Sequence, residues 1–508
     1  MALLKLGHKG WCRTKPPQEL LQANGLVQCS ILDNYIVRDK KLKKTPGTSA
    51  YNTSLGSLGI PFIMRSYHIQ ADGEIVKRTH CYYDRKLYWG NDSSGALTET
   101  NLTTLGANVL PRFFIIQEAE NSIAYLLTGK DSPKKYNGNG SYLWDDAGGD
   151  IGDIFNYTDA VVHLDRAFYV KHQSSALDYS ESLAAETIED TVIIGQDKDS
   201  FNVRVVIGAN ETLFVFKNNS IYQLYGRTPS QFQFRKVTDK YGLATKRGIY
   251  PVGNGFVFLN TFDKELYWFG GTESSIKPMT EEDIRLREII NHTPQALENV
   301  DMTVADGLFR FAFQHKESAI NSNNCELVYC ITEPDERGLP KWSLIKGSNV
   351  WCYSVWDKYG DRELLTGRSN IGKIMYNNRG HKFDDVPIIT QFRTAEVVAS
   401  EDMTGRFTGF FIKGKPTAHT VTSTFQYFVN ANISKRGESS IEMFGEYRTI
   451  GTIKLITQEL FNNRIIPLTE NSRGNSIAFG LYDQNETDLE IYSISFGFEE
   501  KYIIRNIY

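Results

Sequence analysis

Short apolar runs separated by polar turns recur along the chain and predict β-hairpins. The stretch LFVFKNNSIYQLYG, residues 213–226, contains two apolar runs around a four-residue polar turn and ends in glycine. Comparable patterns occur at residues 81–90, 124–138, 161–170, 255–271 and 364–378. The second strand of these hairpins tends to end in Tyr or Trp followed by Gly or Asn, residues that suit a turn with positive φ. The recurrence indicates a repeated structural unit.

A further apolar run precedes many of the hairpins, for example residues 201–207 before Leu213. Each unit therefore has three or four short strands and recurs every 40 to 50 residues, roughly the period of a propeller blade. Runs such as LFVF and FVFL are apolar at consecutive positions, which indicates strands covered on both faces. Radially stacked sheets cover one another in this way. We predict an all-β fold with a β-propeller of six or seven blades.

The hairpin at residues 213–226 also yields a local prediction. Leu213 and Val215 should pack against one neighbouring blade, and Phe214 and Phe216 against the other. Residues 217–220 should form an exposed turn. A charge at Phe214 is expected to prevent folding, whereas changes at Asn218 should be tolerated.

Helical patterns are few. TEEDIRLREIINHTPQALE, residues 280–298, combines a Thr N-cap with acidic residues in the first turn and an apolar stripe, so it predicts a helical insertion between blades. LAAETIED, residues 183–190, predicts a second short helix.

The pattern changes near residue 380, where longer alternating strands begin. We predict three regions: an extended segment at 1–60 that contributes to closure of the propeller, the propeller at 61–380, and a C-terminal β-sandwich at 381–508. The helical insertion near 280–298 lies within the second region.

Composition narrows the functional classes. The chain has 508 residues, an aromatic content of 12% and a net charge of −4, so it is a globular β-rich chain and not a global polycation. This charge argues against a dedicated nucleic-acid binder. The six cysteines are scattered without CxxC spacing, which favours free thiols in a reducing cytoplasm over disulfides. No segment has the roughly 20 apolar residues of a membrane-spanning helix.

Three groups of residues are candidates for a functional site. The first is the acidic cluster in WDDAGGDIGDIF, which offers oxygen ligands for Ca²⁺ but lacks EF-hand spacing, so a solvated loop is the favoured interpretation. The second is a combination of His8, Cys12, His80 and Cys81, whose spacing fits no common zinc pattern. The acidic cluster of the first group consists of Asp145, Asp146, Asp150 and Asp153.

The third group is a basic run near the N-terminus, which could face phosphates if the protein encircles DNA. A solvated strand and turn is the favoured alternative. The run consists of Arg38, Lys40, Lys41, Lys43 and Lys44. Common phosphate-loop, esterase and zincin motifs are absent from the sequence. We therefore predict no catalytic, cofactor-binding or metal-binding residues, and no enzymatic activity.

Five segments, taken in order, resemble structural propellers of bacteriophage tails. They are VRDKKLKKTPGT, LFVFKNNSIYQLYG, YGLATKRGIYPVGNGFVFLN, NCELVYCITEPDERGLPKWSLIKG, and LLTGRSNIGKIMYNNRG followed by PIITQFRTAEV. The family comprises the tail hub, nozzle and head-to-tail stabilisation proteins, especially of short-tailed phages. The resemblance covers about residues 25 to 505, with a less glycine-rich opening and an added insertion near Glu281.

The resemblance implies a virion component that is assembled in the host cytoplasm and forms an oligomeric, often sixfold, ring below the portal. Such a ring surrounds the DNA exit channel and touches the passing genome transiently. It also contacts portal or adaptor proteins and anchors tail fibres or spikes. The alternative is a carbohydrate-active propeller, a glycosidase or lyase of a tail spike, because Tyr and Trp side chains can stack on sugars. A cellular propeller scaffold lacks support from WD or kelch signatures.

Overall fold

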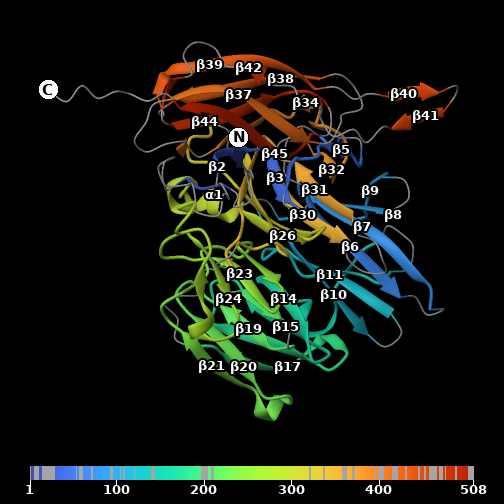
Figure 1. Ribbon diagram of the computed structural model, residues 1–508. Helices are drawn as coiled ribbons and strands as arrows, with labels where there is room; N and C mark the ends of the chain where they lie inside the picture. The colour runs from blue at the N-terminus through green and yellow to red at the C-terminus, as the bar shows by residue number, and fades with distance from the viewer. Residues whose placement is uncertain are drawn as a thin grey trace.

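The computed structural model is almost entirely β-structure, with repeated small sheets below and longer strands above (Figure 1). It describes residues 2–4, 11–13, 29–39, 41–52, 54–56, 61–69, 73–91, 95–102, 105–106, 109–118, 121–138, 143–195, 204–207, 211–319, 322–335, 338–356, 363–368, 372–394, 396–398, 405–414, 421–429, 432–443, 447–450, 453–456, 466–467, 473–474, 476–486 and 489–500.

Within these ranges, seven sets of four antiparallel strands follow one another along the chain. Units one to three are β6–β9 (Phe62–Ile69, Ile75–Tyr83, Lys86–Asn91, Thr98–Glu99), β10–β13 (Arg112–Glu118, Asn121–Leu127, Lys134–Tyr136, Asp145–Asp146) and β14–β17 (Tyr157–His163, Arg166–Lys171, Ala176–Glu181, Ala184–Ile193). Units four to six are β18–β21 (Arg204–Ile207, Leu213–Phe216, Ile221–Tyr225, Gln233–Thr238), β22–β25 (Ile249–Val252, Gly255–Leu259, Leu266–Phe269, Lys277–Pro278) and β26–β29 (Asp301–Ala305, Leu308–Phe313, Cys325–Cys330, Ser343–Lys346).

The seventh unit is built from both ends of the propeller sequence. Strands β30 (Val350–Trp356), β31 (Glu363–Arg368) and β32 (Ile374–Asn377) are completed by β5 (Thr48–Ala50), with Ala50 opposite Met375. The first strand of this unit, β30, contacts β6 of unit one and β26 of unit six. The ring of sheets is therefore closed, and the predicted all-β propeller fold is confirmed.

The sheets stack through apolar side chains on both faces, as the consecutive apolar runs predicted. In β19, Leu213 and Val215 join a core with Phe168 of unit three, while Phe214 and Phe216 join a core with Phe256 of unit five. The ring of Phe214 lies 5.2 Å from that of Phe269 in an edge-to-face contact. Strand β19 thus gains burial on two sides, and burial of this kind is the main source of stability in such a stack.

The predicted exposed turn at residues 217–220 is wrong at both ends. Lys217 is fully buried, and its ammonium donates to Ser175 Oγ (2.9 Å) and to the carbonyl of Ile194 (3.1 Å) in unit three. Ser220 is also buried, Asn218 is half-buried, and of these four residues Asn219 alone is exposed. The polar residues of this turn suggest exposure to solvent, but unit three supplies the hydrogen-bond partners of Lys217 and so allows it to be buried.

The helix predicted at residues 280–298 is also wrong in extent. The segment contains a 3-10 turn, η6 (Leu286–Glu288), and a five-residue helix, α1 (Pro294–Glu298). Arg285 has φ 51°, which breaks a helical path, and the buried carboxylate of Glu265 accepts the backbone N–H groups of Leu286 (2.9 Å) and Arg287 (3.1 Å). Tertiary hydrogen bonds have replaced helical ones, while the apolar stripe still enters the core.

The second predicted helix, at residues 183–190, is a strand instead. Residues 184–193 form β17, the outermost strand of unit three, and pair with β16. The described residues contain three further 3-10 turns, η2 (Gly149–Ile151), η4 (Pro229–Gln231) and η5 (Glu273–Ser275).

The C-terminal strands form a sandwich that includes the beginning of the chain. One sheet has the order β3-β4-β45-β37-β42, with β1 beside β45 and β43 beside β37. The opposite sheet contains β2, β35, β44, β38 and β39, with β36 beside β44. Small hairpins β33–β34 and β40–β41 complete the region. The bounds are β1 Ala2–Leu4, β2 Cys29–Asp33, β3 Tyr35–Arg38, β4 Lys41–Lys44, β33 Lys382–Phe383, β34 Val386–Pro387, β35 Thr390–Thr394, β36 Val397–Val398, β37 Gly405–Gly414, β38 Val421–Val429, β39 Asn432–Met443, β40 Tyr447–Ile450, β41 Ile453–Ile456, β42 Ile466–Pro467, β43 Arg473–Gly474, β44 Ser476–Asp483 and β45 Glu490–Glu500.

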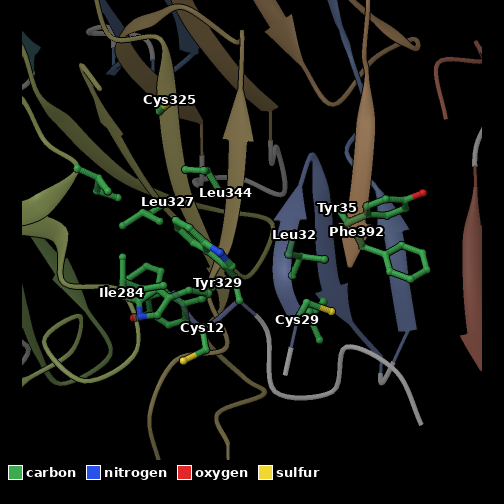
Figure 2. Packing of buried hydrophobic residues seen from close by; sticks show 14 of the residues in the cluster. Cys12, Cys29, Leu32, Tyr35, Ile284, Cys325, Leu327, Tyr329, Leu344 and Phe392 are labelled. Atoms are coloured by element: carbon green, nitrogen blue, oxygen red, sulfur yellow. The ribbon is translucent and has the colours of Figure 1, made fainter. Parts of the chain in front are cut away.

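The sandwich and the propeller are joined by one continuous sheet. Strand β2 pairs in parallel with β29 of unit six, through Asp33 and Leu344, and antiparallel with β35 on its other edge. Figure 2 shows Leu32 and Cys29 on this strand between Phe392 on one side and Tyr329 and Leu344 on the other. The predicted segment 1–60 therefore contributes strands to the sandwich as well as β5 to the propeller.

Asn34 locks the turn between β2 and β3. It adopts φ 59°, a conformation that Asn tolerates, and is buried. Its backbone N–H donates to the carbonyl of Leu344 (2.8 Å), its amide donates to the carbonyl of Ile389 (2.7 Å), and its amide oxygen accepts from the N–H of Lys346 (2.7 Å). One side chain thus ties together three segments that are distant in sequence.

The two-sided packing of β19 predicts unequal responses at Phe214 and Asn219. Phe214→Asp places a carboxylate in an apolar interface and should abolish soluble expression. The free-energy cost of burying an unpaired charge is larger than the net folding stability of a typical domain. Asn219→Asp, in the exposed part of the same hairpin, should leave the yield and the melting temperature close to wild type. Equal soluble yields would contradict the packing of β19 between two sheets.

A buried ion pair between β4 and β44 predicts a second contrast. Lys44 Nζ lies 2.8 Å from Asp483 Oδ2, and both side chains are almost fully buried. Lys44→Met should cost about 3–5 kcal/mol of unfolding free energy because it leaves a buried carboxylate without its cation. Lys43→Met removes a neighbouring surface pair with Asp39 and should cost less than about 1 kcal/mol.

Chemical denaturation of the two variants measures this difference. The double variant Lys44→Met/Asp483→Leu should recover much of the loss, since both charges are then removed together. Similar unfolding midpoints for the Lys44 and Lys43 single variants would show that the buried pair does not hold β4 to the opposite sheet, which contains β44.

Candidate functional site

The central channel of the propeller is the candidate site. It forms a cavity of about 430 Å³ whose lining comes from the first strand of every unit, or from the residues just before it, together with Phe256 on the second strand of unit five. These strands are β6, β10, β14, β18, β22, β26 and β30. Because repeated units place their first strands side by side around the axis, residues far apart in sequence meet here.

Two arginines of the channel share one carboxylate. Arg112 Nε, at the start of β10, lies 2.9 Å from Asp159 Oδ1, and Arg204 Nη1, at the start of β18, lies 3.2 Å from the same oxygen. Asp159 lies on β14, between these two units, and is fully buried. One negative charge therefore faces two positive charges at this side of the channel.

A third arginine precedes β22. Arg247 Nη2 lies 2.9 Å from Asp301 Oδ2 and donates to the carbonyl of Trp351 (2.7 Å). The same carboxylate oxygen accepts the N–H of Tyr353 (2.8 Å). Arg247 thereby connects units five, six and seven, and its guanidinium lies over the ring of Phe62, at 5.1 Å from its centroid.

Lys246 adds a fourth cation. Its ammonium donates to Thr158 Oγ1 (2.6 Å) on β14. Burial lowers the pKa of Lys246 to about 8, although Asp159 nearby favours the charged form. Burial likewise lowers the pKa of Arg204 to about 10, with Arg112 contributing in the same direction. The channel thus brings four cationic side chains together with two carboxylates, so positive charge is in excess there.

The acidic cluster predicted as a solvated loop is indeed exposed. Asp145, Asp146, Asp150 and Asp153 all lie in solvent, on β13 and around η2. Asp146 pairs with Lys134, and Asp150 Oδ2 accepts the N–H of Ile188 (2.8 Å). In the part of the chain that is described, no three His, Cys, Asp or Glu side chains gather in a way that could hold a metal ion.

The zinc combination is not brought together. Cys12 is buried in the core that joins propeller and sandwich, whereas Cys81 is buried in the core between units seven, one and two. His8 lies outside the described residues. All six cysteines are buried thiols, as expected, and none forms a disulfide.

The basic run near the N-terminus is divided between solvent and core. Lys44 is buried with Asp483, Lys43 pairs with Asp39 (2.6 Å), and Lys41 lies 3.8 Å from Glu490. Arg38 is half-buried, and Lys40 lies outside the described residues. These lysines are engaged in ion pairs within the sandwich, which weakens the hypothesis that the run faces phosphates.

The sequence reasoning missed a buried Ser–His cluster in unit one. Ser66 Oγ lies 2.7 Å from His68 Nε2 and 3.0 Å from His80 Nε2, and His68 Nδ1 lies 2.9 Å from the carbonyl of Ser122. Ser66 and His68 share a strand face by their spacing of two, which is a signal that the sequence carries. All three side chains are almost completely buried, and aromatic rings of Tyr136 and Trp144 pack on His80. The cluster is therefore a hydrogen-bonded part of the core without access for a substrate.

The channel cations were also missed. Arg112, Arg204 and Lys246–Arg247 stand at or just before the first strand of units two, four and five, so their common position in the repeat was the available signal. Among the described residues, no helix has the length and apolar character needed to cross a membrane.

The buried histidines predict loss of stability in acid. Burial lowers the pKa of both His68 and His80, so the folded protein keeps them neutral while the unfolded chain takes up protons below about pH 6.5. The free energy of unfolding should therefore fall as the pH drops from 7 to 5, by up to about 1.4 kcal/mol per pH unit for each proton.

Urea unfolding at pH 7, 6 and 5 tests the predicted loss of stability in acid. His80→Gln should be less stable at pH 7 but should show a shallower decline with acid, whereas His292→Gln, at an exposed position, should keep the wild-type decline. Parallel pH profiles for all three proteins would rule out His80 as a source of the acid sensitivity.

No protein-family model and no curated protein matches the chain, so its family is open. Among solved structures, BBS1N in complex with ARL6DN matches with a TM-score of 0.40 and 12% identity, over 66% of this chain and 97% of that one. PorZ, a surface component of the type-IX secretion system of Porphyromonas gingivalis, matches with a TM-score of 0.38 and 8% identity, over 79% of this chain and 46% of that one. The extracellular domain of BT4673 from B. thetaiotaomicron matches with a TM-score of 0.35 and 10% identity, over 74% and 45%. These values assign neither a family nor a function to the chain.

Proposed function

We propose that the chain is a structural virion protein of a bacteriophage tail. Several copies form a ring below the portal and its adaptor proteins, around the path by which DNA leaves the particle. The ring anchors tail fibres or spikes, is assembled in the host cytoplasm and has no enzymatic role. The ordered motifs that resemble tail hub and nozzle propellers motivate this proposal.

The continuous sheet between propeller and sandwich is the observation that supports it best. Strands β2, β35, β44, β38 and β39 continue the sheet of unit six, and the junction between β2 and β29 is one parallel pair, Asp33 with Leu344. Two buried hydrogen bonds of Asn34, with Leu344 and Lys346, reinforce this junction. Such a connection resists bending better than a flexible linker, because separation would leave buried polar groups without their partners. Such a fused body suits a part that must carry load between neighbouring proteins in a tail.

The distribution of charge is compatible with DNA that passes without being held. The chain has a net charge of −4, and the described lysines of the basic run are paired with carboxylates. Tight binding would require unpaired cations arranged along phosphates. The alternative of a carbohydrate-active propeller gains no specific support, since Asp301, which lines the channel, and Asp159, which is buried behind it, are both paired with guanidinium groups.

Quantitative mass spectrometry of purified virions tests the proposal. In particles of the phage that carries the gene, the chain should be present in several copies and in a constant ratio to the portal protein. Its absence from purified particles would refute the proposed function.

The assembled state can be tested on the purified full chain or on isolated tails. Negative-stain electron microscopy should show rings, and antibody labelling should place them between the portal and the distal end of the tail. A label found only at fibre tips, together with cleavage of host polysaccharide, would favour the carbohydrate-active alternative.

A further inference from the structure

We propose that the central channel binds a small phosphate-class oxyanion, one that carries at least two negative charges. The inference is independent of the tail role, because it rests on the side chains of the channel alone. Arg112, Arg204, Lys246 and Arg247 supply the cations.

The first argument is the charge imbalance. Asp159 and Asp301 are the carboxylates paired with the three arginines, and the ammonium of Lys246 donates to a neutral hydroxyl. Among the side chains that line the channel or pair with its arginines, four cations face two anions, which leaves an excess of two positive charges. Glu298, which is exposed on α1, is a further acidic neighbour of Lys246. Like charges held close together in a protein interior repel strongly, so a dianion between them would relieve an unfavourable interaction.

The second argument is unused hydrogen-bonding capacity. Arg204 Nε and Arg247 Nη1 are buried nitrogen atoms that have no hydrogen-bond partner among the described residues. Their side chains are only 12% and 13% exposed. A buried guanidinium with a donor left over is costly, and oxyanions are the ligands that such donors match best.

The third argument is the size and position of the cavity. A volume of about 430 Å³ lies within the range of small-molecule sites, and a DNA duplex does not fit into it. The cations belong to units two, four and five, and Asp159 of unit three stands among them. Donors that approach from separate strands suit a tetrahedral group, since its oxygens point in different directions.

The groups around Lys246 set the pH range in which binding should occur. Asp159 and Glu298 favour its charged form, Arg204 opposes it, and His172 is a further titratable neighbour. Lys246 carries its charge below its pKa of about 8 and loses it as the pH rises. Binding of an anion whose own charge is constant should therefore weaken between pH 7 and pH 9.

Calorimetric titration of the full chain with inorganic phosphate, pyrophosphate and sulfate tests the proposal at constant ionic strength, with chloride as the reference salt. Lys246→Gln and Arg204→Gln should each weaken binding at least about tenfold. Arg235→Gln is the matched control, because Arg235 lies exposed on β21 of the same unit as Arg204 and should bind like wild type. The Lys246 variant keeps the test valid if Arg204→Gln fails to fold.

Sulfate supplies the pH test, because it remains a dianion from pH 6 to 10. Its affinity should fall from pH 7 to pH 9 in the wild type and stay level in Lys246→Gln. The proposal is overturned if the three anions bind no better than chloride, or if all variants bind equally. It is also overturned if a single-stranded oligonucleotide displaces phosphate from the same residues, since the channel would then serve a polymer.

Discussion

The pairing of the first fifty residues with strands that follow some three hundred positions later is the constraint on which the rest of the structure depends. Strand β5 closes the seventh unit, and β2 bridges unit six and the sandwich. A ring of sheets that is not closed exposes two edges, and an exposed edge is a site of aggregation. The entropy cost of such distant pairing rises only with the logarithm of chain length, so the burial gained on both faces of each sheet outweighs it.

Polar groups at this junction determine which strands pair. Apolar contacts in the shared core favour burial in any register, whereas the three hydrogen bonds of Asn34 and the Lys44–Asp483 pair form only in one. Glu265 acts similarly where unit five meets the segment after residue 280, because its carboxylate accepts from Thr280, Leu286 and Arg287. We infer that buried polar groups are retained here for specificity, at a cost in desolvation.

The predictions from sequence succeeded where the cause was local and failed where it was tertiary. The consecutive apolar residues of LFVF predicted a strand covered on both faces, with Leu213 and Phe214 facing different units, because successive side chains in a strand point to opposite faces. The sequence predicted that Lys217 lies in solvent, but Ser175 and Ile194 accept hydrogen bonds from its ammonium. It also predicted one helix over residues 280–298, but the carboxylate of Glu265 accepts N–H groups of this segment. The channel cations were overlooked because Arg112, Arg204 and Arg247 meet only after the ring has closed.

Closure of the ring and the charge of the channel are consequences of the same geometry. When seven first strands surround one axis, any charge at the start of a strand is brought near its counterparts in the other units. Asp159 and Asp301 compensate part of the positive charge and already link neighbouring units through Arg112, Arg204 and Arg247. An anion bound among these side chains would add contacts between units that are not adjacent, and ligand binding to the folded state alone raises its stability. The channel would then contribute to the rigidity of the ring, so a binding site there is compatible with a structural role.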